Sequence, residues 1–304
     1  MEAPITDLLK GARGCVVQAD NLAVLAELPD GSVDLIYVDP PFNTGKRQTL
    51  QRMRTVRDEN GDRTGYQGHR YRTVRLGTTG YLDVFDNYLD FLEPRLVQFH
   101  RVLRTTGSLY FHIDYREAHY CKVLLDAIFG RACFLNEVIW AYDYWARTTK
   151  KWPAKHDNIL VYVKSTDDYY FDADAVERIP YMAPGLVGPE KAARGKLPTD
   201  TWWHTIVPPG GEERTGYPNQ KPLGILRRIV SASCPPGALV ADFFAGSGST
   251  GAASYELGRK FLMVDNNPEA AAVMARRYAA YAEVAFVGMG SEPDNGPERL
   301  AGGR

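Results

Sequence analysis

Apolar and polar residues follow two periods along this chain, one typical of buried strands and one typical of helices. Short apolar runs predict strands at residues 15–19, 33–38, 108–113, 136–142, 158–164 and 169–172. Longer amphipathic segments predict helices at residues 20–28, 84–104, with a break or kink at Pro94, and 116–130. The alternation predicts an α/β fold in which helices cover both faces of a mixed, mostly parallel sheet.

A second informative pattern lies in residues 238–269. An apolar run ends at Asp242, a glycine-rich turn follows, and a helix of residues 249–257 leads to a strand that ends at Asp265. The match Gly246-x-Gly248-x-x-Gly251 lets the backbone approach a ligand closely, and the helix N-terminus offers free N–H groups. Asp265 stands 19 residues after Gly246 and can accept hydrogen bonds from ribose hydroxyls. The pattern predicts a Rossmann-like nucleotide-binding crossover, with a tight turn or helix packing as the alternative explanation of the glycines.

The crossover comes late in the chain, and this position predicts the strand order. Only one helix follows Asp265, capped by Asn267 and running to about Tyr281. The missing strands must therefore come from the N-terminal half, so we expect the strand at 15–19 beside the Asp265 strand. This is a circularly permuted order.

The domain organisation follows from these segments. We predict a catalytic domain of residues 14–172 and 215–285, and a disordered, glycine-rich tail of residues 286–304. Between the two parts, residues 173–214 lose the periodicity and become rich in Pro, Gly and Trp, so we predict an inserted lobe that recognises the substrate.

Composition and charge narrow the class of protein. The 304 residues are 44% hydrophobic, enough for the core of one large domain, and no apolar run or signal-peptide layout suggests a membrane segment. We expect a cytoplasmic protein. The four cysteines are scattered, and neither they nor the histidines show metal-ligand spacing, so no metal is expected. The net charge is −1, but residues 44–80 carry nine Lys or Arg against three acidic residues. This polar, glycine-dotted segment predicts a basic loop insert.

Three short motifs, taken together, resemble those of a known protein family. The sequence DPPF (39–42) follows an apolar strand, TGYPNQKP covers 215–222, and FAGSGST covers 244–250. In this order they resemble the beta group of DNA amino-methyltransferases, over residues 14 to 281. The alanine after phenylalanine in FAGSG is a conservative departure. The resemblance implies S-adenosylmethionine as the methyl donor, an exocyclic amino nitrogen of a DNA base as the acceptor, and a DNA-recognition role for the lobe at 173–214.

The DPPF motif suits this chemistry. An exocyclic amine is a poor nucleophile because its lone pair is delocalised into the ring, so it needs acceptors that localise the lone pair. Asp39 can accept one N–H and the carbonyl of Pro40 the other, while Pro40 and Pro41 hold that carbonyl in a fixed direction. Phe42 would stack on a base flipped out of the duplex. The alternative for Asp39 is a turn residue that ends a strand.

The resemblance and the local chemistry together assign the cofactor residues. Phe244, Gly246 and Gly248 are expected to shape the methionine end, Thr250 to donate to its carboxylate, and Asp265 to bind the ribose. Three further positions each have two possible roles. Asp20 accepts from the adenine amino group or caps a helix, Asp242 contacts the cofactor or orients the turn, and Lys221 lies near the cofactor carboxylate or in solvent.

Basic and aromatic residues predict the DNA-facing surface. Residues 140–157 interleave Trp140, Tyr142, Tyr144, Trp145 and Trp152 with Arg147, Lys150, Lys151 and Lys155. Cations on phosphates and aromatic rings on exposed bases would suit a flipped-out substrate, whereas an edge strand followed by a solvated loop is the alternative. On the basic insert, Arg47, Arg52 and Arg54 are further candidates for phosphate contacts.

The expected function is site-specific methylation of adenine N6 in double-stranded DNA. Within the resembled group, an aspartate at the first motif position is more usual for adenine enzymes, and cytosine N4 is the alternative target. A nicotinamide-dependent oxidoreductase is a more remote alternative, because it would leave DPPF unused. A second copy of the chain and a cognate restriction endonuclease are candidate partners.

Overall fold

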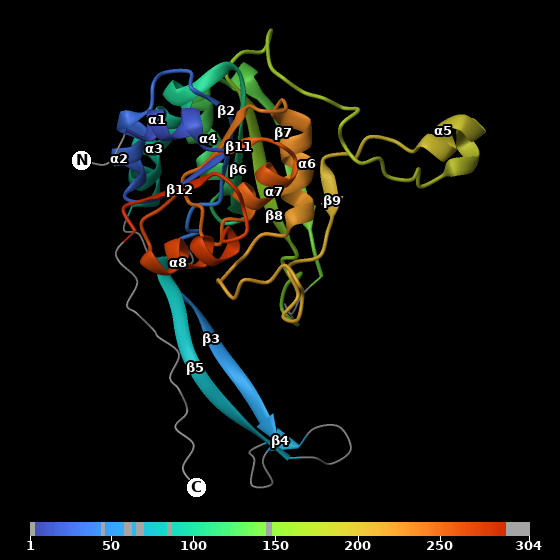
Figure 1. Cartoon of the computed structure of the whole chain (residues 1–304). Coiled ribbons are helices and arrows are strands. Elements are labelled where there is room, and N and C mark those ends of the chain that lie inside the picture. The colour runs from blue at the N-terminus through green and yellow to red at the C-terminus, as the bar shows by residue number, and fades with distance from the viewer. Residues whose placement is uncertain are drawn as a thin grey trace, which may run out of the picture.

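The structure, a computed structural model, describes residues 4–43, 46–57, 63–64, 70–83, 87–143 and 148–289, and its centre is a nine-stranded sheet (Figure 1). The strands lie in the order β12-β1-β11-β10-β2-β6-β8-β7-β9. Their bounds are β1 Gly14–Gln18, β2 Val33–Val38, β6 Leu103–Asp114, β7 Phe134–Ala141, β8 His156–Val163, β9 Thr201–Trp203, β10 Leu239–Asp242, β11 Lys260–Asp265 and β12 Val284–Val287. Neighbours from β12 to β6 pair in parallel, whereas β8 is antiparallel to both β6 and β7.

Helices cover both faces of this sheet, as the sequence predicts. They are α1 Ile5–Gly11, α2 Asn21–Glu27, α3 Tyr88–Val102, α4 Ala118–Phe129, α6 Leu223–Ser233, α7 Ser249–Glu256 and α8 Pro268–Arg277. A further helix, α5 Pro189–Arg194, lies apart from the sheet, and short 3-10 turns lie at Arg131–Cys133 and Pro184–Leu186. Alternate strand residues face opposite sides, because side chains of a strand have period two. Ile36 and Val38 join a core with α1 to α4, and Leu35 and Tyr37 join a second core with α6 to α8.

The permuted order is also confirmed. Strand β1, from the N-terminus, pairs in parallel with β11, and Gln18 lies opposite Asp265. Strand β10 lies between β11 and β2. The carboxyl ends of β1, β11, β10 and β2 therefore meet at one edge of the sheet, where ligands of open α/β sheets bind.

The basic insert is not the loop that its composition predicts. Strands β3 (Lys46–Arg57) and β5 (Arg70–Asp83) pair antiparallel, with the short strand β4 (Arg63–Thr64) beside β5, and the hairpin extends away from the main sheet in Figure 1. Its polar residues and glycines are typical of a loop, but its Thr, Val and Tyr residues favour extended backbone.

Other boundaries also differ from the expectation. Helix α3 runs through Pro94 without a break, and residues 169–172 form no strand. The strand β12 pairs with β1, so residues 286 and 287 belong to the sheet, while residues 290–304 of the expected tail lie outside the described residues.

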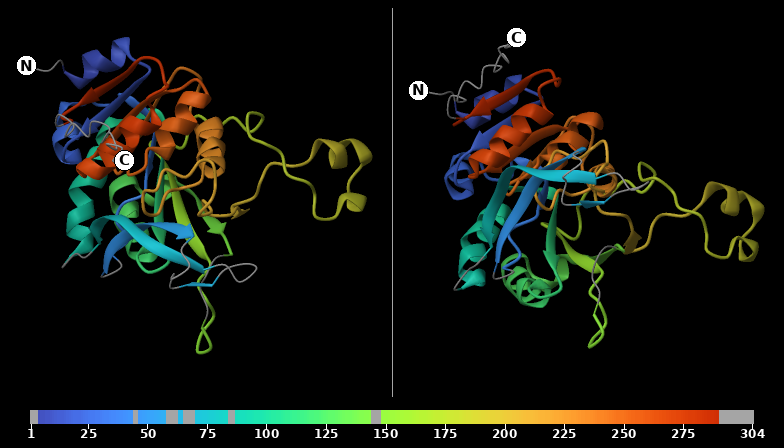
Figure 2. Two further views of the ribbon diagram at one scale, coloured as in Figure 1. Left: turned by 60° about the horizontal axis from the view of Figure 1, so that its bottom comes forward. Right: turned by 90° about the horizontal axis from the view of Figure 1, so that it is seen from below.

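The segment expected to be an inserted lobe does leave the body of the protein. Figure 2 shows α5 and the chain around it extending away from the sheet in both views. Its C-terminal end returns as β9, which pairs in parallel with β7. Part of residues 173–214 therefore completes the edge of the main sheet.

Candidate functional site

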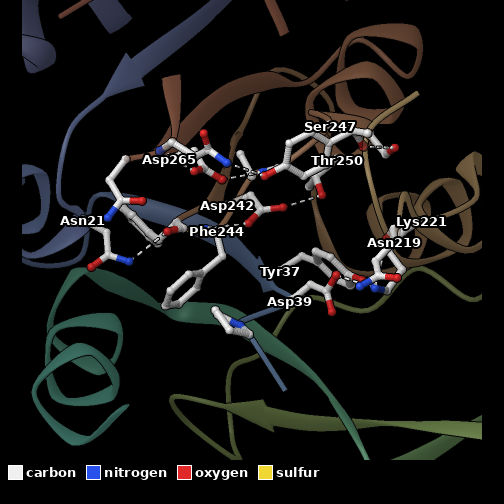
Figure 3. A pocket seen from close by; sticks show the side chains of 18 of the residues that line it. Asn21, Tyr37, Asp39, Asn219, Lys221, Asp242, Phe244, Ser247, Thr250 and Asp265 are labelled. Carbon is white, nitrogen blue, oxygen red and sulfur yellow. Dashed lines mark hydrogen bonds and ion pairs between the residues drawn. The ribbon is translucent and has the colours of Figure 1, made fainter. Parts of the chain in front are cut away.

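A cavity of about 350 Å³ opens at the carboxyl ends of β1, β11, β10 and β2 (Figure 3). Each of these strands contributes an acidic residue at its end, so the sheet order brings together side chains from distant parts of the sequence. The lining includes Asp20, Asn21, Tyr37, Asp39, Pro41, Phe91, Arg95, Tyr217, Asn219, Lys221, Asp242, Phe244, Gly246, Thr250 and Asp265. The cavity thus contains residues of all three sequence motifs.

The DPPF motif follows β2 and forms one wall of this cavity. The side chain of Asp39 is only 18% exposed, and its Oδ2 accepts a hydrogen bond from Lys221 Nζ. Asp39 Oδ1 is buried and has no hydrogen-bond partner among the described residues. Pro41 lines the cavity, while Pro40 is buried behind it. Phe42 is half-buried, and the Nζ atom of Lys221 lies 5.1 Å from the centre of its ring.

Asp242 ties the glycine-rich turn to the start of α7. Its Oδ1 accepts from the backbone N–H of Phe244 at 3.0 Å, and its Oδ2 accepts from Thr250 Oγ1 at 2.7 Å. Burial is the main reason that the pKa of Asp242 rises to about 7; the two hydrogen bonds oppose the rise, and the charges of Asp39 and Asp265 add to it. Asp242 therefore orients the turn. Because the Thr250 hydroxyl donates its proton to Asp242, it does not offer that proton to a cofactor carboxylate in this structure.

Two glycines of the turn have different roles. Gly246 lines the cavity with φ +49°, and its N–H donates to Asp265 Oδ2 at 2.8 Å. Gly248, with φ +72°, caps α7 outside the cavity lining, and a Cβ there would lie 2.3 Å from the Tyr278 hydroxyl. The packing explanation therefore accounts for Gly248, whereas Gly246 faces the cavity.

Asp265 and Asp20 stand at the ends of adjacent strands. The two Asp265 oxygens accept from Gly246 N and Asn267 N, and burial, partly offset by these bonds, raises the pKa of its carboxyl group. Asp20 caps α2 through a 2.9 Å hydrogen bond from Leu22 N, and its half-exposed carboxylate also lines the cavity. Asp20 can therefore cap α2 and also face a ligand in the cavity.

Sequence reasoning missed Arg95, which lies on α3. Its Nε donates to Asn21 Oδ1 at 2.8 Å, its Nη2 lies 3.4 Å from Asp20 Oδ2, and its guanidinium covers the Phe91 ring at 4.0 Å. The side chain is almost fully buried at the cavity wall. A basic residue directly after Pro94 on an otherwise amphipathic helix was the available signal.

A buried histidine behind Asp39 was also missed as part of the site. His112 on β6 is fully buried, with Nδ1 2.7 Å from the Tyr37 hydroxyl and Nε2 3.2 Å from Asp157 Oδ2. Its ring centre lies 5.7 Å from that of Phe42. His112 lies in the predicted strand at residues 108–113, but no local pattern indicates Tyr37 or Asp157 as its partners.

The predicted DNA-facing residues are only partly described. Lys150 and Lys151 are exposed before β8, and Trp152 is 94% exposed. Arg47, Arg52 and Arg54 lie on β3, but their side chains fall outside the described part of the structure, as do residues 144–147 with Arg147. Trp140 cannot stack on a base, because it is buried and donates to the backbone of His204. Within the described ranges, there is no cluster that could hold a metal and no helix long and apolar enough to cross a membrane.

The charges around the cavity indicate which ligand it fits. The carboxylates of Asp20, Asp39, Asp242 and Asp265 outnumber the cations Lys221 and Arg95. Such a lining favours a ligand that carries positive charge and hydroxyl groups, and S-adenosylmethionine has a sulfonium, an ammonium group and a ribose. The fold and the cavity together define a Rossmann-like methyltransferase.

Comparisons with known proteins agree with this class. Residues 33–276 match the N6/N4 DNA methylase family, and the chain belongs to it. It is 30% identical over 264 residues to the DNA adenine methyltransferase YhdJ of Escherichia coli, covering 84% of this chain and 79% of that protein. It is 26% identical to the Type II methyltransferase M.HpaI of Haemophilus parainfluenzae, covering 84% of this chain and 70% of that one.

Solved structures share the fold. The M1.HpyAVI–SAM complex superposes with a TM-score of 0.56 at 19% identity, covering 87% of this chain and 98% of that one. The cytosine-N4-specific PvuII DNA methyltransferase gives 0.59 at 16% identity, covering 88% and 89%. The protein is thus a DNA methyltransferase that uses S-adenosylmethionine, and the nicotinamide alternative falls away.

Proposed function

We propose that this protein methylates the N6 amino group of adenine in double-stranded DNA, with Asp39 and the Pro40 carbonyl as acceptors for the target amine. The observation that carries the proposal is the carboxyl group of Asp39 at the wall of the cofactor cavity, whose Oδ1 has no hydrogen-bond partner among the described residues. The choice of adenine is supported by the adenine methyltransferase YhdJ, at 30% identity, and by the aspartate that begins the motif.

When bound, S-adenosylmethionine supplies an electrophilic methyl group attached to a sulfonium. The chain's own contribution is to prepare the amine. Asp39 accepts one N–H, which localises the nitrogen lone pair, and its negative charge stabilises the positive charge that develops on that nitrogen. The half-buried Phe42 offers its ring to the flipped base.

The cofactor residues are assigned by their place in the cavity. Asp265 and Asp20 end adjacent strands and are proposed to bind the ribose and the adenine amino group. Phe244 and Gly246 form the turn beside the methionine end, and Asp242 acts through the turn. Gly248 and Thr250 contribute indirectly, by packing and by the Asp242 hydrogen bond.

Lys221 is proposed to serve two groups in turn. It lines the cavity, where it can reach a cofactor carboxylate, and it also pairs with Asp39. The ion pair holds the Asp39 carboxylate in place before a substrate is present.

The DNA contacts and partners are part of the same proposal. Arg47, Arg52 and Arg54 on the hairpin, Arg147, and Lys150 and Lys151 on their loop are proposed to bind phosphates, while residues 173–214 recognise the target sequence. The relation to M.HpaI, named a Type II methyltransferase, supports a cognate restriction endonuclease. We also propose a homodimer, which light scattering of the purified protein tests. Acting on DNA fits the cytoplasmic location expected from the sequence.

Analysis of the product tests the target base. DNA from a methylation-free host is incubated with the protein and S-adenosylmethionine, digested to nucleosides and analysed by mass spectrometry. We expect N6-methyladenine. Finding N4-methylcytosine alone would overturn the choice of base and leave the role of Asp39 unchanged, because both amines offer two N–H groups.

A further inference from the structure

The two oxygens of Asp39 have very different surroundings. Oδ2 accepts from Lys221, whereas Oδ1 is buried and lacks a hydrogen-bond partner among the described residues. His112 Nδ1 lies 3.8 Å from Oδ1. A buried carboxylate oxygen is normally satisfied, so an unpaired one beside a potential donor needs a physical reason.

The hydrogen bonds of His112 supply that reason. Burial raises the pKa of Asp157, but the hydrogen bonds from His112 and the Tyr142 hydroxyl and the charge of Lys221 outweigh burial and hold that pKa below its usual value. Asp157 is therefore ionised near neutral pH and can only accept. The imidazole must place a proton on Nε2, which lies 3.2 Å from Asp157 Oδ2.

The other ring nitrogen has a hydroxyl group within hydrogen-bond distance. Burial, with the charges of nearby aspartates, raises the pKa of Tyr37 well above its usual value, so its hydroxyl keeps its proton. At 2.7 Å from Nδ1, that hydroxyl can donate to an imidazole lone pair. With the bond in this direction, His112 directs no proton at Asp39.

We propose that Asp157 is a positioning residue that locks His112 in its Nε2–H tautomer, so that no imidazole proton competes with the target amine for the carboxylate of Asp39. In the opposite tautomer, Nδ1–H would face Oδ1 across the 3.8 Å gap, and a small movement of the ring would make it a competitor of the substrate. Asp157 thereby acts on the reaction through His112 and Asp39. The inference rests on the proposed role of Asp39.

The tautomer is directly measurable in the whole protein. Imidazole nitrogen-15 NMR distinguishes a protonated from an unprotonated ring nitrogen, and the chain has six histidines. The signals of His112 are those that a His112→Gln variant lacks. In the wild type we expect the proton on Nε2. In Asp157→Asn, where the amide can donate to Nε2, and in Asp157→Leu, which offers no acceptor, we expect the proton to move to Nδ1.

Single-turnover methyl transfer at saturating cofactor and DNA gives the second readout. We expect Asp157→Asn to be slower by about 10- to 100-fold, the usual effect of removing a residue that orients another, with unchanged cofactor affinity. The matched control is Asp126→Asn, because Asp126 also accepts from a tyrosine hydroxyl, that of Tyr162, outside the cavity. It should transfer methyl groups at the wild-type rate.

Three results would overturn the inference. One is a wild-type His112 that carries its proton on Nδ1, a measurement that requires no variant to fold. The others are an unchanged tautomer in both Asp157 variants, and a changed tautomer in Asp157→Asn with a rate within threefold of the wild type. If Asp39→Ala itself remains active, the proposed function fails instead, so the two failures are distinguishable.

Discussion

Lys221 donates a hydrogen bond from its ammonium group to Oδ2 of Asp39, although 182 positions separate the two residues in the sequence. The pair is largely buried, with side-chain exposures of 10% and 18%. Loss of one member leaves the other as an uncompensated buried charge. The DPPF motif and the segment before α6 therefore form one functional unit.

Replacing Lys221 should affect turnover more than cofactor binding. In Lys221→Met, Asp39 loses the cation that orients it, and we expect turnover to fall by about 10- to 100-fold. The affinity for S-adenosylmethionine, measured by calorimetry, should fall by less than turnover does, because the cofactor carboxylate is only one of the two groups that Lys221 serves. The control is Lys122→Met, which removes a Lys–Asp pair outside the cavity. A large loss of cofactor affinity with normal turnover would show that Lys221 serves the cofactor carboxylate instead.

Replacing Asp39 should separate binding from chemistry. Asp39→Ala removes the acceptor for the amine, and loss of one such preorganised group slows reactions by about 10²- to 10³-fold. Cofactor affinity should remain nearly intact, because Asp39 acts on the amine. Turnover on methylation-free DNA and calorimetry provide the two measurements, and thermal unfolding checks the fold. Turnover within tenfold of the wild type would refute the assignment of Asp39.

The pKa of Asp242 predicts a pH-dependent cofactor affinity. Its value of about 7 means that the carboxyl is partly protonated in the free protein at neutral pH. A bound cation favours the ionised form, lowers this pKa and releases a proton. Affinity should therefore increase by up to about tenfold from about pH 6 to pH 8 and then level off, since one pKa unit corresponds to a factor of ten.

Calorimetry in buffers of different ionisation enthalpy measures both the affinity and the released proton. In Asp242→Asn the pH dependence should largely disappear, whatever the absolute affinity of the variant. Equal wild-type affinities at the two pH values would exclude a coupling between Asp242 and the ligand.

Charge removal on the hairpin should weaken DNA binding and flatten its salt dependence. Neutralised phosphates release counterions, so each lost contact reduces the slope of log K against log salt by about 0.9. The test is a triple variant with Arg47→Gln, Arg52→Gln and Arg54→Gln. We expect its slope to fall by about 0.9 for each of these arginines that contacts a phosphate. A control with Lys10, Arg104 and Arg131 replaced by glutamine removes the same charge elsewhere. If both triple variants give the wild-type slope, the hairpin does not contact DNA.

The sequence predicted those parts of the fold that depend on residues close together in the chain. The apolar strand at residues 33–38 and the acids Asp242 and Asp265 at strand ends were located correctly, because strand period and glycine-rich turns are short-range signals. The hairpin of β3 and β5 was missed, because its sequence shows no apolar alternation and its polar residues and glycines are typical of a loop.

The site was harder to predict where it depends on sheet order. His112 meets Asp157 because β6 pairs with β8, and Tyr37 meets His112 because β2 pairs with β6. Arg95 reaches Asn21 across 74 positions. These contacts join residues that are far apart in the sequence, and no local sequence pattern indicates them. The residues therefore resembled ordinary core or surface positions.

The permuted strand order also has a consequence for synthesis. Strands β1 and β2 lie within the first 38 residues, yet β11 and β10, which end at residues 265 and 242, are the strands that fill the space between them. A chain emerging from the ribosome therefore presents the DPPF motif long before the cofactor cavity can exist. Until the last strands insert, β1 and β2 each keep an open edge, and such edges pair readily with other chains. Newly made protein should depend on chaperones during this interval, and fragments released before residue 239 should aggregate and lack methyltransferase activity.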